Sequence, residues 1–321
     1  MRVLLWHVHG SWTTSFVQGG HDYLLPVVPD RGADGGGRAR TWDWPANARE
    51  VTPEQLRDEQ VDVVVLQRPR DLELVREWLG REPGVDLPAV FVEHNTPKGE
   101  VPMTRHPLAD RDDIPVAHVT YFNELFWDSG RAPTVVVEHG VVDPGELYTG
   151  ELARAGIAIN EPVRRGRVTG SDLLPRFAEV APLDVFGMRL AGLHEKFGLD
   201  PSRVTLHEDP PQAAMHAELA RRRVYVHPLR WTSLGLSLIE AMHLGMPVVV
   251  LASTEAVEAV PEEAGCLSTR VDVLTEAVRR FLSDPDAARL AGKAARAYAL
   301  ERYGLGRFLS DWDRLLREVV R

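Results

Sequence analysis

The stretch from Val224 to Ala252 constrains the fold of this chain more than any other segment. It opens with a short β-branched and aromatic run that stops at Pro228, which is typical of a strand. Thr232 and Ser233 are favourable N-cap residues for a helix, and Gly245 is well placed to end that helix. An apolar run of the kind found in buried parallel strands closes the stretch. The pattern therefore predicts a strand, a loop, a helix and a second strand of a parallel sheet.

The predicted helix carries one acid, Glu240, on the same face as Ser237. A helix N-terminus behind a Gly-containing loop offers backbone N–H groups and the positive end of the helix dipole, which favour a phosphate. We expect these N–H groups to come from Gly235, Leu236 and Ser237. A carboxylate about one turn deeper can accept hydrogen bonds from two vicinal hydroxyls, as on a ribose. The competing interpretation of Glu240 is a solvent-facing helix acid.

The same residues resemble the donor-binding signature of retaining GT-B glycosyltransferases of the glycogen-synthase-like class, family 4. The family pattern is E-x-F-G-L-S-x-x-E-A-M-x-x-G-x-P-V-V, and the segments Leu234–Met242 and Gly245–Val249 match it closely. In that family the second Glu usually holds the ribose, and it is present here as Glu240. The first Glu usually holds the donor sugar, and Thr232 stands in its place. The resemblance implies that Thr232 and Ser233 lie near the sugar, where Thr232 supplies a hydrogen bond but no charge.

An arginine-rich segment, residues 160–167, follows another predicted strand. It resembles the family's G-R-x-x-x-x-K-G loop, whose Arg and Lys hold the diphosphate. Arg165 falls on the Lys, and Arg164 or Arg167 stands in for the Arg. Arginine grips phosphate bidentately, and with the helix dipole it removes the need for a metal ion. The competing interpretation is a solvated basic loop. His207 follows a further strand end and is our candidate to frame the nucleobase.

His94 ends an apolar, strand-like run, where α/β sheets present ligand-facing residues. On its own it fits a structural role equally well. Many family members have a His at the equivalent strand end, so the resemblance implies that His94 hydrogen-bonds the donor sugar and lines the reacting face. It need not be a base, because retaining enzymes of this class are thought to use the departing phosphate to take the acceptor proton. Asn95 and Thr96, with Gly10 and Ser11 in a predicted loop, are our acceptor-side candidates.

Two groups of residues imitate metal sites. His7 and His9 alternate on one predicted strand, but a third ligand is not visible and a core or cleft-edge role is favoured. Asp110, Asp112 and Asp113 imitate the D-x-D motif of the other glycosyltransferase fold, but they lie in a polar turn. We therefore expect no metal and no cofactor beyond the nucleotide-sugar substrate.

The length of 321 residues suits two domains. Alternating strand and helix patterns indicate parallel, doubly wound sheets. The segment Gly140–Asp143 resembles the family's N-G-V-D loop, which ends the first domain, with His139 in place of the Asn. We therefore expect an α/β chain of two Rossmann-like, doubly wound domains facing a cleft, the GT-B fold. The acceptor-side domain is expected at 1–150 and the donor-side domain at 151–302, with a terminal helix at 303–321 that crosses back to the first domain.

Charge restricts the possible partners. Residues 1–150 carry 14 Lys and Arg against 24 Asp and Glu, whereas the rest of the chain carries 23 of each. An acidic first half disfavours nucleic acid and anionic membranes as partners, and it favours a small-molecule or glycan acceptor that is soluble. Cys266 is the only cysteine, so no internal disulfide is possible, and buried filler is its expected role. No run is apolar enough for a signal peptide or a membrane span, and we expect a cytoplasmic protein.

The sequence leaves three functions open. The first is a retaining, metal-independent glycosyltransferase in which cleft closure precedes reaction. The second keeps the fold but changes the chemistry, as in a nucleotide-sugar epimerase or a pseudo-glycosyltransferase. The third is a non-catalytic partner subunit that has kept the nucleotide site. The replacement of an acid by Thr232 and the missing long helix after the first strand motivate this third possibility.

Overall fold

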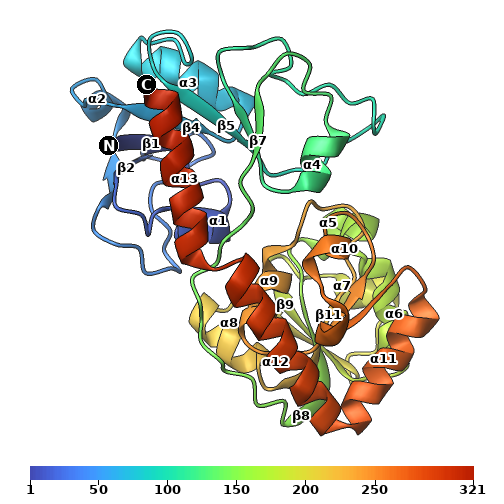
Figure 1. Cartoon of the computed structure of the whole chain (residues 1–321). Coiled ribbons are helices and arrows are strands. Elements are labelled where there is room, and N and C mark those ends of the chain that lie inside the picture. The colour runs from blue at the N-terminus through green and yellow to red at the C-terminus, as the bar shows by residue number, and fades with distance from the viewer. The chain divides into compact units, whose positions relative to one another are not determined.

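The computed structural model describes residues 1–321 and divides into two compact units (Figure 1). The first unit contains Met1–Val142 together with Leu305–Arg321, and the second contains Asp143–Gly304. Each unit is built on one sheet whose neighbouring strands all run parallel. Both sheets are thus of the Rossmann-like, doubly wound kind that the sequence predicts.

The first sheet has seven strands in the order β3-β2-β1-β4-β5-β6-β7. The chain moves outward from β1 in one direction and then returns to place β4 on its other side, so the topological switch point lies between β1 and β4. The strands are β1 (Arg2–Leu5), β2 (Asp22–Pro26), β3 (Ala48–Val51), β4 (Val63–Leu66), β5 (Ala89–Glu93), β6 (Val116–His118) and β7 (Thr134–Val136). The helices between them are α1 (Gly10–Phe16), α2 (Pro53–Leu56), α3 (Pro69–Leu79) and α4 (Tyr121–Phe126).

The second sheet has six strands in the order β10-β9-β8-β11-β12-β13, which puts its switch point between β8 and β11. The strands are β8 (Leu152–Ala158), β9 (Leu183–Gly187), β10 (Val204–Glu208), β11 (Arg222–His227), β12 (Val248–Leu251) and β13 (Gly265–Ser268). The helices are α5 (Pro162–Arg165), η1 (Gly166–Thr169), η2 (Ser171–Leu173), α6 (Leu174–Ala178), α7 (Leu193–Phe197), α8 (Gln212–Leu219), α9 (Leu236–His243), α10 (Ala256–Ala259), η3 (Glu262–Ala264), α11 (Val271–Ser283) and α12 (Pro285–Arg302).

The last helix, α13 (Leu305–Val320), belongs to the first unit and lies across α1, β4 and β5. In Figure 1 it is the red helix that lies over the blue strands. Its buried stripe includes Phe308 and Trp312, and the Trp312 ring packs edge-on against Trp12, with the ring centroids 5.5 Å apart. A Cβ at Gly140 would lie 2.2 Å from Phe308 Cβ, so this position needs a glycine for the helix to approach. Aromatic packing thus fixes the C-terminus to the first sheet.

Three local predictions are wrong, and two strands were missed. The segment from Gly10 to Thr14 is not a loop but lies in the short helix α1, and α9 begins at Leu236 with Gly235, not Thr232 or Ser233, as its N-cap. Two edge strands, β3 and β13, were not predicted because each is only four residues long and poor in apolar residues. Cys266, expected to be buried, is only partly buried because it lies on edge strand β13.

Gly292→Ala is expected to destabilise the chain, although alanine is the better helix former by about 1 kcal/mol. Gly292 lies inside α12 where this helix packs on α9, and an added Cβ would lie 1.9 Å from the Gly245 carbonyl oxygen. Because a backbone atom is in the way, we expect a loss of about 1–3 kcal/mol in urea unfolding. Gly306→Ala is the matched control, since nothing lies within 4 Å of its Cβ, and it should stabilise. Equal effects at both glycines would contradict this packing.

Candidate active site

The carboxyl edge of the second sheet brings α5 and α9 to the switch point between β8 and β11. A hydrogen bond joins the two sides, because Ser237 Oγ in the first turn of α9 donates to the Ala158 carbonyl at the end of β8, over 3.4 Å. The Tyr225 hydroxyl on β11 donates to the same Ser237 Oγ at 3.0 Å. In open α/β sheets, ligands bind at this point, outside the carboxyl ends of the strands.

The N-terminus of α9 is shaped for close approach. A Cβ at Gly235 would lie 2.4 Å from the His227 ring, so only glycine leaves room for that imidazole. Burial lowers the pKa of His227 to about 3, which keeps its ring neutral beside the helix end. The N–H groups of Leu236 and Ser237 lie in the first turn, where an α-helix leaves its donors without intrahelical partners. The arrangement can accept an anion through backbone N–H groups.

Glu240 lies one turn further along α9 and is not a solvent-facing acid, since only 3% of its surface is exposed. Its Oε1 accepts a hydrogen bond from Gln212 Nε2 at 3.1 Å, and its Oε2 lies 3.4 Å from His216 Nε2. Both partners come from α8. Glu240 is thus a buried carboxylate near the switch point, with a hydrogen-bond donor on one oxygen and an imidazole beside the other.

Three arginines follow β8, and only two of them form ion pairs. The Arg164 guanidinium pairs with Glu161, and Arg167 pairs with Asp172 at 3.0 Å. The Arg165 side chain makes no ion pair or hydrogen bond with another residue, although it is half-buried. Burial and then repulsion from Arg164 lower the pKa of Arg165, against the attraction of Glu161. Arg165 is thus the positive charge in this segment that remains available to an anionic ligand.

Backbone strain gathers at the same edge of the sheet. Glu161, Arg189 and Asp209 have φ angles of 54°, 57° and 41°, and they follow β8, β9 and β10 respectively. Positive φ is uncommon for such residues and costs free energy. The Glu161 N–H donates to the Met188 carbonyl at 2.8 Å, which is part of what holds this conformation. Strained residues of this kind cluster at ligand sites.

Some predicted donor-site residues lie elsewhere or have other partners. His207 Nε2 contacts Asp184 Oδ1 at 2.9 Å, and its ring stacks on Phe186 with the ring centroids 4.3 Å apart. His207 therefore belongs to an ion-pair cluster on the sheet face. Ser233 is 3% exposed and its carbonyl accepts the Glu255 N–H at 3.3 Å, while Thr232 is partly exposed in the loop before α9.

The first unit presents a separate set of candidates at the ends of β1 and β5. His94 follows β5 and stacks against His9, with the ring centroids 3.9 Å apart, while its buried Nε2 has no hydrogen-bond partner. Burial holds the pKa of His94 well below its ordinary value, and nearby His9 and His139 lower it further. The ring is therefore neutral at pH 7 and able to hydrogen-bond a hydroxyl. No spacing rule in the sequence links His94 to His139, which follows β7.

The acceptor-side candidates lie on either side of His94. The Asn95 N–H donates to Glu93 Oε1 at 2.6 Å, and the Asn95 carbonyl accepts from Trp127 Nε1 at 2.8 Å, so the turn after β5 is firmly held. Thr96 is buried, with 3% of its surface exposed. Gly10 and Ser11 form the first turn of α1, and Trp42 covers Gly10 so closely that a Cβ there would lie 2.4 Å from the indole ring.

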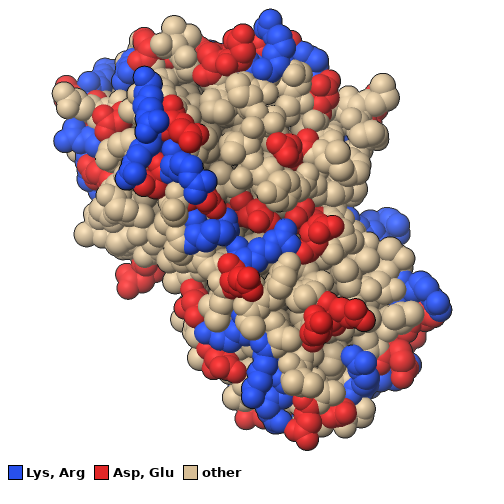
Figure 2. Space-filling view, in the orientation of Figure 1, with Lys and Arg blue, Asp and Glu red and all other residues tan.

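No group of three or more His, Cys, Asp or Glu side chains is arranged to hold a metal ion. None of the helices has the length and apolarity needed to cross a bilayer. Acidic and basic side chains are interspersed over the face shown in Figure 2. Many of them are paired, as with Arg296 and Asp143 at 2.8 Å.

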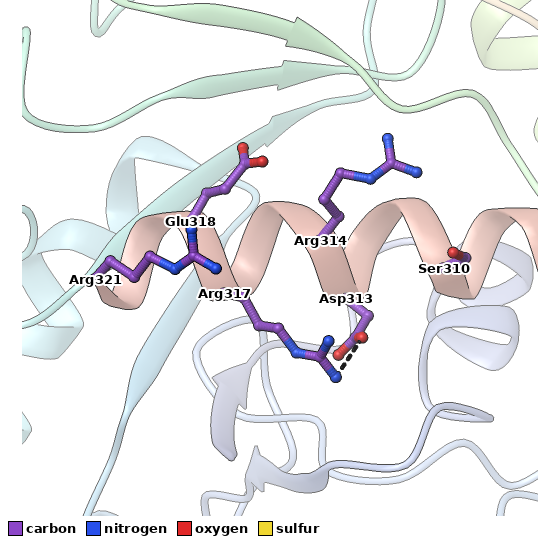
Figure 3. Close-up of a pocket in the computed structure, with 6 residues that line it drawn as sticks. All are labelled: Ser310, Asp313, Arg314, Arg317, Glu318 and Arg321. Carbon is purple, nitrogen blue, oxygen red and sulfur yellow. Dashed lines mark ion pairs between the residues drawn. The ribbon is translucent and has the colours of Figure 1, made fainter.

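Two depressions in the first unit contain none of the predicted site residues. One, of about 260 Å³, lies along α13, where Arg317 pairs with Asp313 at 2.7 Å (Figure 3). The other, of about 450 Å³, lies between the segment 28–34 and α3. Their lining is strongly charged with both signs, which gives no clear preference for one ligand.

Comparison with known proteins gives a family and a fold. Residues 173–284 match the family model described as "Glycosyl transferases group 1", whereas no curated protein sequence matches the chain. Sucrose-phosphate synthase from Thermosynechococcus elongatus is similar in structure, with a TM-score of 0.72, 15% identity and 99% of each chain covered. HepE from Anabaena, in complex with UDP, is also similar, with a TM-score of 0.68, 14% identity and 99% of each chain covered. A glycosyltransferase from Rickettsia africae has a TM-score of 0.68 and 12% identity, and the match covers 100% of this chain and 98% of that one.

Identities this low establish the fold but no substrate. The family match covers α6 to α11, including the α9 helix and its preceding loop. The chain therefore has the GT-B fold with a group 1 glycosyltransferase domain at residues 173–284, and it is a glycosyltransferase.

Proposed function

We propose that the protein is a retaining, metal-independent glycosyltransferase that moves a sugar from a nucleotide-diphosphate donor to a soluble acceptor. The observation that carries this proposal is the arrangement at the switch point of the second sheet. There the unpaired, half-buried Arg165 and the buried Glu240 belong to the two segments, α5 and α9, that follow β8 and β11. Cation, helix N-terminus and ribose-binding acid are the three parts that a nucleotide diphosphate requires.

In this proposal each residue has a defined role. The Arg165 guanidinium and the first N–H groups of α9 hold the diphosphate and stabilise the negative charge that develops on it as the bond to the sugar breaks. Glu240 accepts hydrogen bonds from the ribose hydroxyls. Neutral His94 hydrogen-bonds the donor sugar, and Thr232 and Ser233 line the sugar site. The departing phosphate oxygen takes the proton from the acceptor hydroxyl, and the sugar keeps its anomeric configuration.

The remaining candidates have subsidiary roles. Arg164 and Arg167 add positive potential to the phosphate site while paired with Glu161 and Asp172. Gly10, Ser11, Asn95 and Thr96 form the acceptor side of the first unit. HepE structures hold UDP and UDP-glucose, so UDP-sugars are the first donors to test.

The test is a panel of UDP-, GDP- and ADP-sugars assayed for hydrolysis and for transfer to neutral sugar acceptors. Product formation with the donor's anomeric configuration, read from NMR coupling constants, supports the proposal. Inverted product contradicts the retaining mechanism. Interconversion of two nucleotide sugars without transfer indicates an epimerase. Nucleotide binding without turnover indicates a non-catalytic partner subunit, the alternative that the Thr232 replacement motivates.

Removal of divalent metal is expected to leave transfer unchanged within about twofold, because Arg165 and the α9 N-terminus supply the positive charge that a metal would otherwise bring to the diphosphate. Initial rates measured after dialysis against EDTA, with and without added Mg²⁺ or Mn²⁺, check this. A loss of about tenfold or more that added metal restores would contradict metal independence. EDTA present throughout the assay is the control against trace metal.

A further inference from the structure

The helix α8 buries polar residues where a packing helix normally buries apolar ones. Of its eight residues, only His216 and Leu219 are buried, at 5% and 1% exposure, and Gln212 at its start is partly buried. Gln212 and His216 are four residues apart, so they lie on one face, one turn above the other. That face therefore serves a purpose other than apolar packing.

Both polar residues meet the same carboxylate. Gln212 Nε2 donates to Glu240 Oε1 at 3.1 Å, and His216 Nε2 lies 3.4 Å from Glu240 Oε2. The second distance is longer than a well-formed hydrogen bond but within the range of an ion pair. His216 Nε2 is buried and makes no hydrogen bond to any other residue. The two residues thus each contact one oxygen of a carboxylate that is almost completely buried.

The other end of α8 is fixed in place. Leu219 packs so closely on β8 that a Cβ at Gly156 would lie 2.5 Å from its Cδ1. Glu218 at the same end pairs with Arg222 of β11 at 2.8 Å. Because β8 and β11 are the strands that flank the switch point, α8 is held against the same two strands that carry the candidate site.

A carboxylate offers about four lone-pair positions, two on each oxygen. Gln212 occupies one position on Oε1 of Glu240, and the His216 ring lies beside Oε2. A buried carboxylate without such contacts is costly, and its side chain would rotate or draw in water. The orientation of Glu240 therefore depends on α8.

We propose that Gln212 and His216 are positioning residues that orient the Glu240 carboxylate toward the ribose diol, so that α8 sets the preference for ribonucleotides over nucleotides without these hydroxyls. The proposal rests on the proposed function, since it takes Glu240 as the ribose ligand. It attributes the discrimination between ribose and deoxyribose to two residues that lie outside the donor signature.

The experiment measures, by calorimetry on the full chain, the Kd of UDP and of 2′,3′-dideoxy-UDP. GDP or ADP with the matching dideoxy compound is used if one of them binds more tightly. The wild type is expected to prefer the ribonucleotide. Gln212→Ala and His216→Ala should each lower that preference by about threefold to tenfold, the range that the net contribution of an ordinary intramolecular hydrogen bond gives. The loss should fall on the ribonucleotide, while the Kd of the dideoxy compound stays unchanged.

Two further variants separate positioning from loosening of the helix. His216→Gln keeps an amide N–H near the position of Nε2 and should retain most of the preference. Met215→Ala trims a partly buried side chain of α8 that makes no polar contact with Glu240, and its preference should equal that of the wild type. Each preference is a ratio within one folded variant, so a change in stability does not imitate the effect.

The outcomes distinguish this inference from the function on which it rests. If Glu240→Ala abolishes the ribose preference while Gln212→Ala and His216→Ala leave it intact, the role of α8 is wrong and the proposed function stands. If the wild type binds none of the three nucleotides, or binds ribose and dideoxyribose forms equally, both fall. An equal loss of preference in Met215→Ala would also overturn the positioning role.

Discussion

Arg165→Ala is expected to lower kcat/KM for sugar transfer by about 100-fold or more, while the protein remains folded. Arg165 has no protein partner, so its removal leaves no buried acid unpaired and stability should change little. Its loss removes the cation that we assign to the leaving diphosphate. Removing one preorganised donor from developing negative charge typically costs about 10²–10³ in kcat. Steady-state rates with the donor identified by the panel, together with thermal melting, check both parts.

Neighbouring arginines provide the controls. Arg164→Ala and Arg167→Ala should each change kcat/KM by about threefold or less, because both guanidinium groups are mostly exposed and already paired with carboxylates. Arg165→Lys should retain part of the activity, since it keeps the charge but loses bidentate geometry. If all three alanine variants lose activity equally, the segment acts through its net charge, and the assignment of a specific role to Arg165 is wrong.

The part of the site that lies within one helix could be predicted from the sequence. Gly235, Ser237 and Glu240 are neighbours along the chain, so helical spacing alone sets their relative positions. The choice among the arginines could not be made in this way. It depends on Glu161 and Asp172, which take up Arg164 and Arg167 and leave Arg165 without a partner.

Contacts between strands and between helices account for what the sequence did not reveal. His207 was a candidate for the base site, but strand register places it beside Phe186 on β9, and it pairs with Asp184 on the same sheet face. The contacts of Gln212 and His216 with Glu240 join two helices separated by a strand. No spacing rule connects such residues, because the sheet order that brings them together is a property of the whole unit.

The fold was predictable wherever apolar runs are buried on both sides. The strands β5 and β12 consist of such runs, and each lies where the sequence predicts a strand. The edge strand β3 instead contains Arg49 and Glu50, which pair with Glu59 and Arg31 at the surface. A half-exposed edge strand of this kind carries too little apolar periodicity to be distinguished from a loop.

Asp184→Ala is expected to cost about 3–5 kcal/mol of unfolding free energy, the usual range when one partner of a buried ion pair is removed. Asp184 is 2% exposed, accepts from Arg222 Nε at 3.0 Å and also pairs with Arg154. Arg222 is 4% exposed, so it would keep its charge with only Glu218 as an acidic partner. Asp184→Asn keeps the shape of the side chain but not its charge, and it should lose at least half as much unfolding free energy as Asp184→Ala. Urea unfolding measures both variants.

Asp172→Asn is the matched control, because Asp172 also pairs with two arginines, Arg167 and Arg230, but is about a quarter exposed. Solvent screening limits its expected cost to about 1 kcal/mol or less. If Asp172→Asn and Asp184→Asn cost the same, burial is not what makes the Asp184 cluster important. A large loss confined to Asp184 would locate this stability in the sheet face that β9, β8 and β11 share.

The contribution of Asp184 should also disappear in acid. Burial alone would raise the pKa of Asp184, but hydrogen bonds from Arg154, Arg222 and His207 outweigh it and hold that pKa below the ordinary value of 3.8. A carboxyl group with a lowered folded-state pKa stabilises the protein above its unfolded-state pKa, and this stabilisation is lost as pH falls through the folded-state pKa. The difference in unfolding free energy between wild type and Asp184→Asn should therefore be constant from pH 7 to about pH 5 and shrink below about pH 4. A difference that stays constant through the acid range would mean that the hydrogen-bond geometry, and not the charge of Asp184, supports the cluster.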